Sequence, residues 1–216
     1  MTSDLFIKQN IFLEDNKIIL SDDFLSFLKS KITDERRYNH SLSVALLCYE
    51  VAKANKLENP LLYYFAGVIH DVGKNFDKIK GEEVIDKYYH EYIDYPKYAY
   101  HQFIGEYILM HDLTIFDNDV LNAVKYHCTG RKLMSPIEKI IYACDKIDPL
   151  RGFDSSSLIK AMKDDWKSGF KVVLKANYDY LLSKVKLKND LNGIFNELSA
   201  ECFKYYLGIE RRKELN

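Results

Sequence analysis

The chain has 216 residues, of which 47% are hydrophobic and 29% charged, as is ordinary for a globular protein. The 31 basic and 32 acidic residues leave a net charge of −1, so no overall electrostatic field favours nucleic acid or an anionic membrane. No apolar run approaches the ~18 residues that would span a bilayer, and the N-terminus lacks a basic stretch followed by an apolar one. We therefore expect a cytoplasmic protein without a signal peptide or a membrane span.

Hydrophobic residues recur with a helical period from Ser21 onward, which predicts helices throughout the rest of the chain. The expected helices cover roughly residues 21–31, 33–55, 60–73, 81–91, 97–111, 117–127, 136–148, 155–187 and 190–209. The one that follows the cap Asn59 and the first-turn residue Pro60 is apolar almost all round, so it should be central and buried. We expect a break near Gly169, and a strand pair or a lead-in helix over residues 5–20.

The predicted fold class is therefore all-α. Ser135-Pro136-Ile137-Glu138 combines a capping box with a first-turn proline, which marks a helix start. Only 9 glycines and 4 prolines are present, and no linker-like stretch divides the chain. We expect one domain over residues 21–216, preceded by an N-terminal segment, 1–20, of unknown role. The cysteines form neither a C-x-x-C pair nor a zinc-ribbon spacing, which favours reduced thiols that pack as small hydrophobic residues.

Four histidines and two aspartates stand out because they recur near the apolar faces of successive predicted helices. They are His40, His70, Asp71, His101, His127 and Asp145. Asp145 is embedded among Ile141, Ala143 and Ile147, so its charge needs a partner that offsets the cost of burial. Imidazole and carboxylate together suit Fe, Mn, Co, Zn or Ni rather than Ca or Mg. The set therefore predicts a transition-metal centre, whereas His90 and His111 lie in contexts typical of ordinary histidines.

The adjacent pair His70 and Asp71 indicates a dinuclear site, because the two oxygens of one carboxylate can bridge two ions. With Asp71 as the bridge, the six side chains supply about seven bonds, whereas two six-coordinate ions need about twelve. About five positions then stay open for water and substrate. Open positions are typical of a catalytic metal site rather than a closed structural one, so we expect an enzyme.

Four stretches of the sequence resemble the YqeK family, which consists of bacterial HD-domain proteins. They are Arg37–Leu42 (RYNHSL), Ala66–Lys74 (AGVIHDVGK), Tyr126–Arg131 (YHCTGR) and Met134–Arg151 (MSPIEKIIYACDKIDPLR). The resemblance covers roughly residues 34–165. It departs from the family pattern at Cys128, Asp148 and Leu150, and none of these positions is a candidate ligand.

The resemblance implies an HD-domain helical bundle with two divalent transition-metal ions. One ion would be held by His40, His70, Asp71 and Asp145, and the other by His101, His127 and the bridging Asp71. The family is associated with iron, and the ligand chemistry also permits Mn or Co. The implied activity is that of a symmetrical bis(5'-nucleosyl)-tetraphosphatase, an acid-anhydride hydrolase that converts diadenosine tetraphosphate into two ADP.

The expected reaction is in-line attack of a metal-bound hydroxide on phosphorus, which requires cations around the charge that builds up. Lys74, Arg131 and Arg151 closely follow candidate ligands in the sequence, so they are candidates for binding the substrate phosphates. Thr129 and Gly130 are also candidates, since small loop residues let backbone N–H groups approach a phosphate. The residues assigned to catalysis are Asp71, Lys74 and Arg131.

Two other interpretations remain open. Another HD-domain nucleotide phosphohydrolase or phosphodiesterase would share the metal chemistry, and the loop from His127 to Arg131 argues against it. A non-catalytic nucleotide-binding module would not need all six ligands. A dinucleoside polyphosphate or another nucleotide is the expected partner, since the neutral net charge argues against extended nucleic acid. A homodimer remains open as the assembly.

Overall fold

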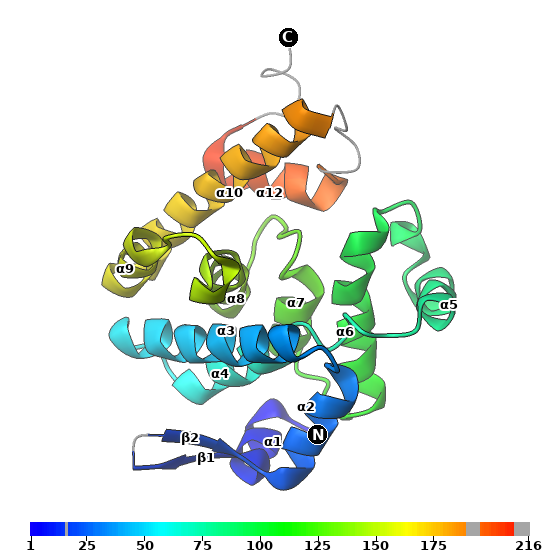
Figure 1. The fold of residues 1–216 in the computed structure, drawn as a ribbon, viewed down its shortest axis with the longest axis vertical. Coiled ribbons are helices and arrows are strands. Elements are labelled where there is room, and N and C mark those ends of the chain that lie inside the picture. The colour runs from blue at the N-terminus through cyan, green and yellow to red at the C-terminus, as the bar shows by residue number, and fades with distance from the viewer. Residues whose placement is uncertain (16, 189–194, 210–216) are drawn as a thin grey trace.

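The computed structural model describes residues 1–15, 17–188 and 195–209, and helices dominate this part of the chain (Figure 1). The elements are α1 (Ser3–Asn10), β1 (Ile11–Glu14), β2 (Lys17–Leu20), α2 (Asp22–Lys31), α3 (Glu35–Ala54), α4 (Pro60–Ile69), α5 (Lys78–Tyr88), η1 (His90–Tyr92), η2 (Lys97–Ala99), α6 (Tyr100–His111), α7 (Asn118–Tyr126), α8 (Pro136–Ile147), η3 (Pro149–Arg151), α9 (Ser156–Asp164), α10 (Trp166–Lys188) and α12 (Glu197–Leu207). The predicted helical class is confirmed. No helix among these residues is long and apolar enough to cross a bilayer.

The N-terminal region contains both of the structures that its sequence left open. Helix α1 leads directly into an antiparallel hairpin, in which Ile11 of β1 faces Leu20 of β2. Residues Phe6 and Ile7 of α1 are buried and join Phe24 of α2 in the core beneath α4. The hairpin is a two-stranded sheet at the edge of an otherwise helical structure, and among the described residues no other strand pairs with it (Figure 1).

Most helix starts follow the capping chemistry of the sequence. Ser135 and Glu138 form the predicted capping box at the start of α8. Asn59 precedes Pro60 as expected, but its backbone is left-handed (φ 46°) and its side chain does not cap α4. The Asn59 amide instead donates a hydrogen bond to the carboxylate of Asp4 (3.0 Å), so this residue joins α4 to α1.

The predicted break near Gly169 was wrong, because the chain breaks at Asp165, between α9 and α10. Gly169 lies inside α10 at a point where the two helices touch: a Cβ atom there would lie 2.7 Å from the backbone of Ala161. The glycine therefore permits close helix packing rather than a turn. Of the helix expected over 190–209, residues 190–194 lie outside the described residues, and the later part forms α12.

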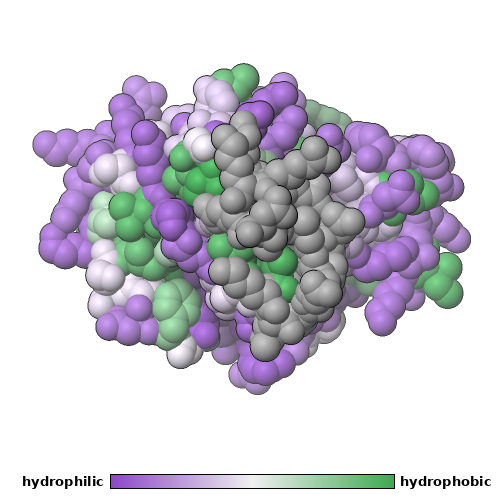
Figure 2. Space-filling view, turned by 90° about the horizontal axis from the view of Figure 1, so that it is seen from above, coloured by the Kyte–Doolittle hydropathy of each residue, from purple (hydrophilic) through white to green (hydrophobic). Residues whose placement is uncertain are grey.

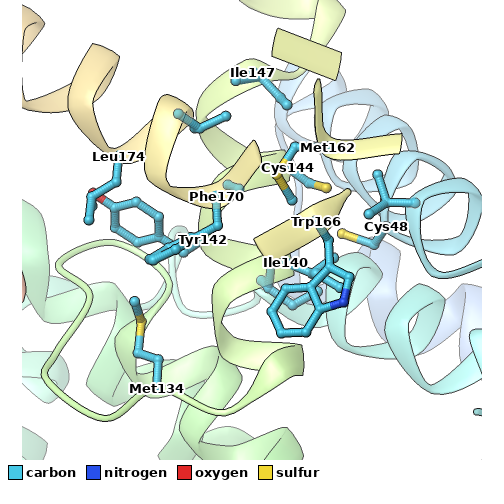
Figure 3. Packing of buried hydrophobic residues seen from close by; sticks show 14 of the residues in the cluster. Cys48, Met134, Ile140, Tyr142, Cys144, Ile147, Met162, Trp166, Phe170 and Leu174 are labelled. Carbon is cyan, nitrogen blue, oxygen red and sulfur yellow. The ribbon is translucent and has the colours of Figure 1, made fainter. Parts of the chain in front are cut away.

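Helix α4 runs through the middle of the protein, as its apolar sequence predicts. Its residues 63–69 are all buried, and its largest set of packing contacts is with α3. One hydrophobic cluster packs α3 and α8 against α9, α10 and α12, with Cys48, Cys144 and Trp166 among its members (Figure 3). A second cluster joins α4 to α1, α2, α5, α6 and α7. In the view of Figure 2, polar side chains cover much of the surface and apolar ones form small patches between them.

The turn after α4 rests directly on α6. A Cβ atom added to Gly73 would collide with the backbone carbonyl of His101 and lie 2.8 Å from the amide nitrogen of Gly105. Only glycine allows two backbone segments to approach so closely. This contact brings the residues that end α4 next to the first turn of α6.

Candidate metal centre

Five helices deliver the six candidate ligands to one buried place. His40 lies on α3, His101 in the first turn of α6 and Asp145 near the end of α8. His70 and Asp71 directly follow α4, and His127 directly follows α7. The helices that carry these residues, α3, α4, α6, α7 and α8, meet in the middle of the molecule (Figure 1). Residues far apart in the sequence therefore face one another across the core.

The ligand atoms form two groups within which every atom lies within 4.8 Å of the others. The groups are His40, His70 and Asp145, and His70, Asp71 and His127. His101 adjoins the second group, since its Nε2 lies 3.0 Å from Nε2 of His127 and 3.4 Å from Oδ1 of Asp71. His70 belongs to both groups, with its Nε2 atom 3.7 Å from an oxygen of Asp71 and from one of Asp145. Both His70 and Asp71 therefore stand between two potential metal positions.

Each of the four histidine rings is held by its Nδ1 atom. The Nδ1 acceptors are the carbonyl oxygens of Gly67 (2.6 Å from His70), Tyr98 (2.6 Å from His101) and Val124 (2.7 Å from His127), and a carboxylate oxygen of Asp148 (2.6 Å from His40). Because Nδ1 donates a proton to these oxygens, Nε2 of a neutral ring offers a lone pair to the shared centre. Metal-binding histidines in proteins are typically oriented in this way.

In the neutral rings of His101 and His127, the two Nε2 atoms are hydrogen-bond acceptors that face each other. Burial and the nearby Lys74 ammonium lower the pKa of His101 well below its ordinary value, and burial lowers the pKa of His127. Their Nε2 atoms thus lie 3.0 Å apart beside a carboxylate oxygen, and among the described residues only that of His101 has a donor nearby, the Lys74 ammonium. Within the described part of the chain, Nε2 of His70 and Oδ1 of Asp71 are buried without a hydrogen-bond partner. A cation between these atoms would convert their repulsion into attraction, so the residues fit a bound metal.

The two carboxylates stay ionised despite their burial. Burial by itself would raise the pKa of Asp145, but the charges of Lys146 and Arg151 hold it well below its usual range. Lys146 donates to one oxygen of Asp145 (2.7 Å), and the Arg151 guanidinium donates to the other oxygen and to the backbone carbonyl. The pKa of Asp71 is likewise held low against burial by the adjacent His70 ring and by the charge of Lys74. Both residues can therefore ligate a cation as carboxylates.

His40 carries a proton where a metal would bind. Burial lowers its pKa, but hydrogen bonds to Asp145 and Asp148 raise it to about 9. Without a metal its ring is therefore an imidazolium at neutral pH, with Nε2 donating to Asp145 (3.1 Å). A metal ion at this position would replace that proton and keep the attraction to Asp145.

Two of the candidate ligands line an open cavity of about 540 Å³, here called the entry pocket. Its lining includes His40, Asp71 and four cations, namely Arg36, Arg37, Lys74 and Arg151. Lys74 places its Nζ 3.0 Å from Nε2 of His101. Lys74 and Arg151 were predicted from the sequence, whereas Arg36 and Arg37 were not. Their positions four and three residues before His40 on α3 could have revealed them, because such residues share a helix face.

The loop after His127 packs inward and does not reach the entry pocket. Arg131 forms a two-point ion pair with the buried Glu138 (2.6 and 3.0 Å), and its guanidinium lies over the Tyr126 ring. The backbone N–H and the hydroxyl of Thr129 both donate to the Gln102 amide oxygen (3.3 Å). The N–H of Gly130 donates to the carbonyl of Tyr126 (2.8 Å). The hydrogen-bonding groups of this loop thus already have partners within the protein, and Thr129, Gly130 and Arg131 do not line the entry pocket.

Metal content tests the shared position of Asp71. We expect about two transition-metal ions per chain in protein purified without a chelator, counted by elemental analysis. Asp71→Ala should empty both positions because it removes the carboxylate between the two groups. His101→Ala should empty mainly one, and His90→Ala, at an exposed histidine paired with Asp86, should leave both filled. A single ion that is retained in Asp71→Ala would contradict the dinuclear model.

The carboxylate of Asp148 provides a second test, because it accepts the hydrogen bond from Nδ1 of His40 and so turns Nε2 toward the ligand cluster. Removing such a partner of a metal-binding histidine typically weakens metal affinity by about 10–100-fold. We expect this loss for Asp148→Ala in a competition titration against a chelator. The control is Asp154→Ala, at an exposed aspartate that interacts with Ser156. Equal affinities in the two variants would show that Asp148 does not position His40 for metal binding.

Comparison with known proteins places these features in a family. The family model for the HD domain matches residues 37–150, the span that contains all six clustered ligands. A solved structure described as a predicted HD superfamily hydrolase involved in NAD metabolism, from Clostridium acetobutylicum, superposes with a TM-score of 0.69. It is 27% identical, and the match covers 87% of this chain and 96% of that one.

Three curated relatives share the same region. The symmetrical bis(5'-nucleosyl)-tetraphosphatase of Staphylococcus aureus is 30% identical over 80% of this chain and 87% of its own length, and the Bacillus subtilis protein of that name is 27% identical. A Mycoplasma pneumoniae protein named probable nicotinate-nucleotide adenylyltransferase/Ap4A hydrolase is 31% identical over 70% of this chain, which spans only 46% of that longer protein. The chain therefore belongs to the HD-domain family, within which it is homologous to the symmetrical bis(5'-nucleosyl)-tetraphosphatases of the YqeK family.

Proposed function

We propose that the protein is a metal-dependent phosphohydrolase that cleaves diadenosine tetraphosphate symmetrically into two ADP. The observation that carries this proposal is the convergence of four histidine Nε2 atoms and two carboxylates beneath a pocket lined by four cations. The ligand set suits transition-metal ions, and the cations suit a polyphosphate chain. The names of the Staphylococcus aureus and Bacillus subtilis relatives support the choice of substrate.

The six clustered side chains would hold the metal ions, with iron as our first choice and Mn or Co as alternatives. When bound, such ions lower the pKa of water and neutralise charge on phosphoryl oxygens. The rigid Nδ1 anchors keep the histidine rings fixed, so the site does not need to reorganise when substrate arrives. Asp71, between the two groups, would align the reacting centre with both of them.

The cations of the entry pocket would bind and orient the polyphosphate. Lys74 is one-third exposed, and its Nζ lies 3.4 Å from Oδ1 of Asp71, so it can reach an anion held at the ligand cluster. Arg151 donates to Asp145 through Nε and Nη2, and its remaining N–H groups can donate to a phosphate oxygen. Arg36 and Arg37 lie farther along the same pocket on α3 and would attract the remaining phosphates.

In the sequence, the loop from His127 to Arg131 is the feature that disfavours another HD-domain phosphohydrolase. Because that loop packs inward, it does not separate the two interpretations by direct substrate contact. The cleavage pattern does so instead, since it reports which phosphorus atom lies over the metal centre.

Loss of the Lys74 cation should slow the reaction without emptying the metal site. Removal of one contact to a developing charge typically costs about 10²–10³-fold in rate, so Lys74→Ala should reduce kcat/KM by about that factor. Metal content, measured in the same samples, should match the wild type. Lys132→Ala, at an exposed lysine paired with Glu201, is the control and should keep wild-type kinetics. Unchanged kinetics in Lys74→Ala would exclude this role.

Arg131 was assigned to catalysis from the sequence, and its substitution separates that role from a structural one. Its ion pair with the buried Glu138 predicts that Arg131→Ala loses about 2–3 kcal/mol of stability, because a buried carboxylate loses its partner. Below the melting temperature, kcat/KM should stay close to wild type. A large loss of kcat/KM with unchanged thermal stability would favour the catalytic assignment instead.

The products of diadenosine tetraphosphate hydrolysis test the proposed function directly. Cleavage of the central anhydride gives two ADP, whereas off-centre cleavage gives AMP and ATP. Chromatography of reactions supplied separately with Fe²⁺, Mn²⁺ or Co²⁺ should show ADP as nearly the sole product, and Asp71→Ala protein should show none. Dominant AMP and ATP would refute symmetric cleavage. Absence of hydrolysis with every metal would favour a nucleotide-binding module without turnover.

A further inference from the structure

A second cavity of about 490 Å³ lies beside the candidate metal centre and shares Arg151 with the entry pocket. This cavity, here called the side pocket, is formed by the end of α8, the segment after η3, and helices α9 and α10. Its walls include Leu158, Val173, Phe153 and Tyr180. Its volume lies within the range of about 300–1,000 Å³ that is typical of sites for small organic ligands.

The side pocket is linked to the metal centre through two cations. Arg151 lines both the side pocket and the entry pocket, and Lys146 lines the side pocket. Both side chains donate to the carboxylate of Asp145, one of the clustered ligands. Only these two side chains separate a ligand in the side pocket from the carboxylate of Asp145. Their positive charge favours a phosphate group at this end of the ligand.

The remaining walls of the side pocket suit a flat aromatic ring. Phe153 and Tyr180 are 48% and 58% exposed, and the Lys184 ammonium lies 5.1 Å from the centre of the Tyr180 ring, so each ring keeps exposed surface. Large aromatic side chains normally bury such surface, and stacking on a planar ligand would do so. Leu158 and Val173 supply apolar contacts beneath them.

Asn177 adds a polar group to this apolar lining. Its Nδ2 atom donates to the hydroxyl of Tyr142 (2.8 Å), which fixes the orientation of the amide. Because Nδ2 is engaged in this way, the amide oxygen is the atom that can accept a hydrogen bond from the exocyclic amine of a base. A pocket with apolar walls, exposed rings and one fixed amide matches the chemistry of a nucleobase.

We propose that the side pocket binds one purine base of the nucleotide substrate, with the base stacked on Phe153 and Tyr180. The phosphates of the same nucleotide then pass Arg151 toward the metal centre. The inference rests on the proposed nucleotide substrate and adds the residues that recognise its base. The other end of a dinucleoside polyphosphate would extend through the entry pocket along Arg36 and Arg37.

Binding of ADP and of pyrophosphate to Mn²⁺-loaded protein, measured by calorimetry, tests this inference. Pyrophosphate carries the anionic part of ADP without the base. Phe153→Ala and Tyr180→Ala should each weaken ADP binding by roughly 5- to 150-fold, the usual effect of removing one stacked aromatic. Pyrophosphate affinity should change by less than about twofold, because its contacts are with the metals and the cations. Both substituted residues are exposed, so the variants should fold, and a melting curve verifies this.

The matched controls are Phe116→Ala and Tyr205→Ala, which remove rings of similar exposure outside the side pocket. These variants should bind both ligands as the wild type does. Unchanged ADP affinity in Phe153→Ala and Tyr180→Ala, or an equal loss of pyrophosphate affinity, would overturn the inference, as would wild-type protein that binds pyrophosphate but not ADP. If the wild type fails to hydrolyse diadenosine tetraphosphate but the two variants selectively lose ADP, the proposed reaction fails and the base site stands.

Discussion

Buried acceptor atoms that face one another are the constraint on which the rest of the structure depends. Nε2 of His101 and His127 lie 3.0 Å apart and close to an oxygen of Asp71, in a region from which water is largely excluded. Such a group is costly to bury unless a cation occupies the space between its members. Lys74 and the proton on His40 supply part of the required charge in the metal-free protein. The five helices that surround the cluster also bury apolar side chains in the two hydrophobic clusters, and this packing keeps the polar side chains in place.

Two of the clustered histidines also complete the helices that they directly follow. His70 follows α4 and His127 follows α7, where the final carbonyl groups of a helix lack intrahelical partners. Each ring donates through Nδ1 to the carbonyl three residues before it, Gly67 or Val124, and so satisfies one of these groups. One hydrogen bond therefore caps the helix and directs Nε2 toward the centre. The position of a histidine directly after a helix is thus both a structural and a functional feature.

In the proposed reaction, the two pockets that share Arg151 would bind different parts of the substrate. The entry pocket is open and rich in cations, whereas the side pocket has apolar walls with exposed aromatic rings. A nucleotide has the same division, since its phosphates are anionic and its base is flat and largely apolar on its faces. Arg151 lies at the junction and is tied to the metal centre through Asp145. The residues proposed to bind metal, phosphate and base therefore include several from one short segment, from Asp145 to Phe153.

The sequence by itself determined the helical class, the central place of α4 and the capping box of α8, because each depends on local periodicity or on neighbouring residues. It also marked the six side chains that the fold brings together, since ionisable residues in apolar surroundings need a partner. Only the tertiary structure decided which cations face the centre. Arg131 follows His127 closely, yet a two-point ion pair turns it toward Glu138, whereas Arg36 and Arg37 reach the entry pocket from another helix. The side pocket could not be predicted from the sequence either. It arises where α8, α9 and α10 pack together, and no local sequence pattern indicates that contact.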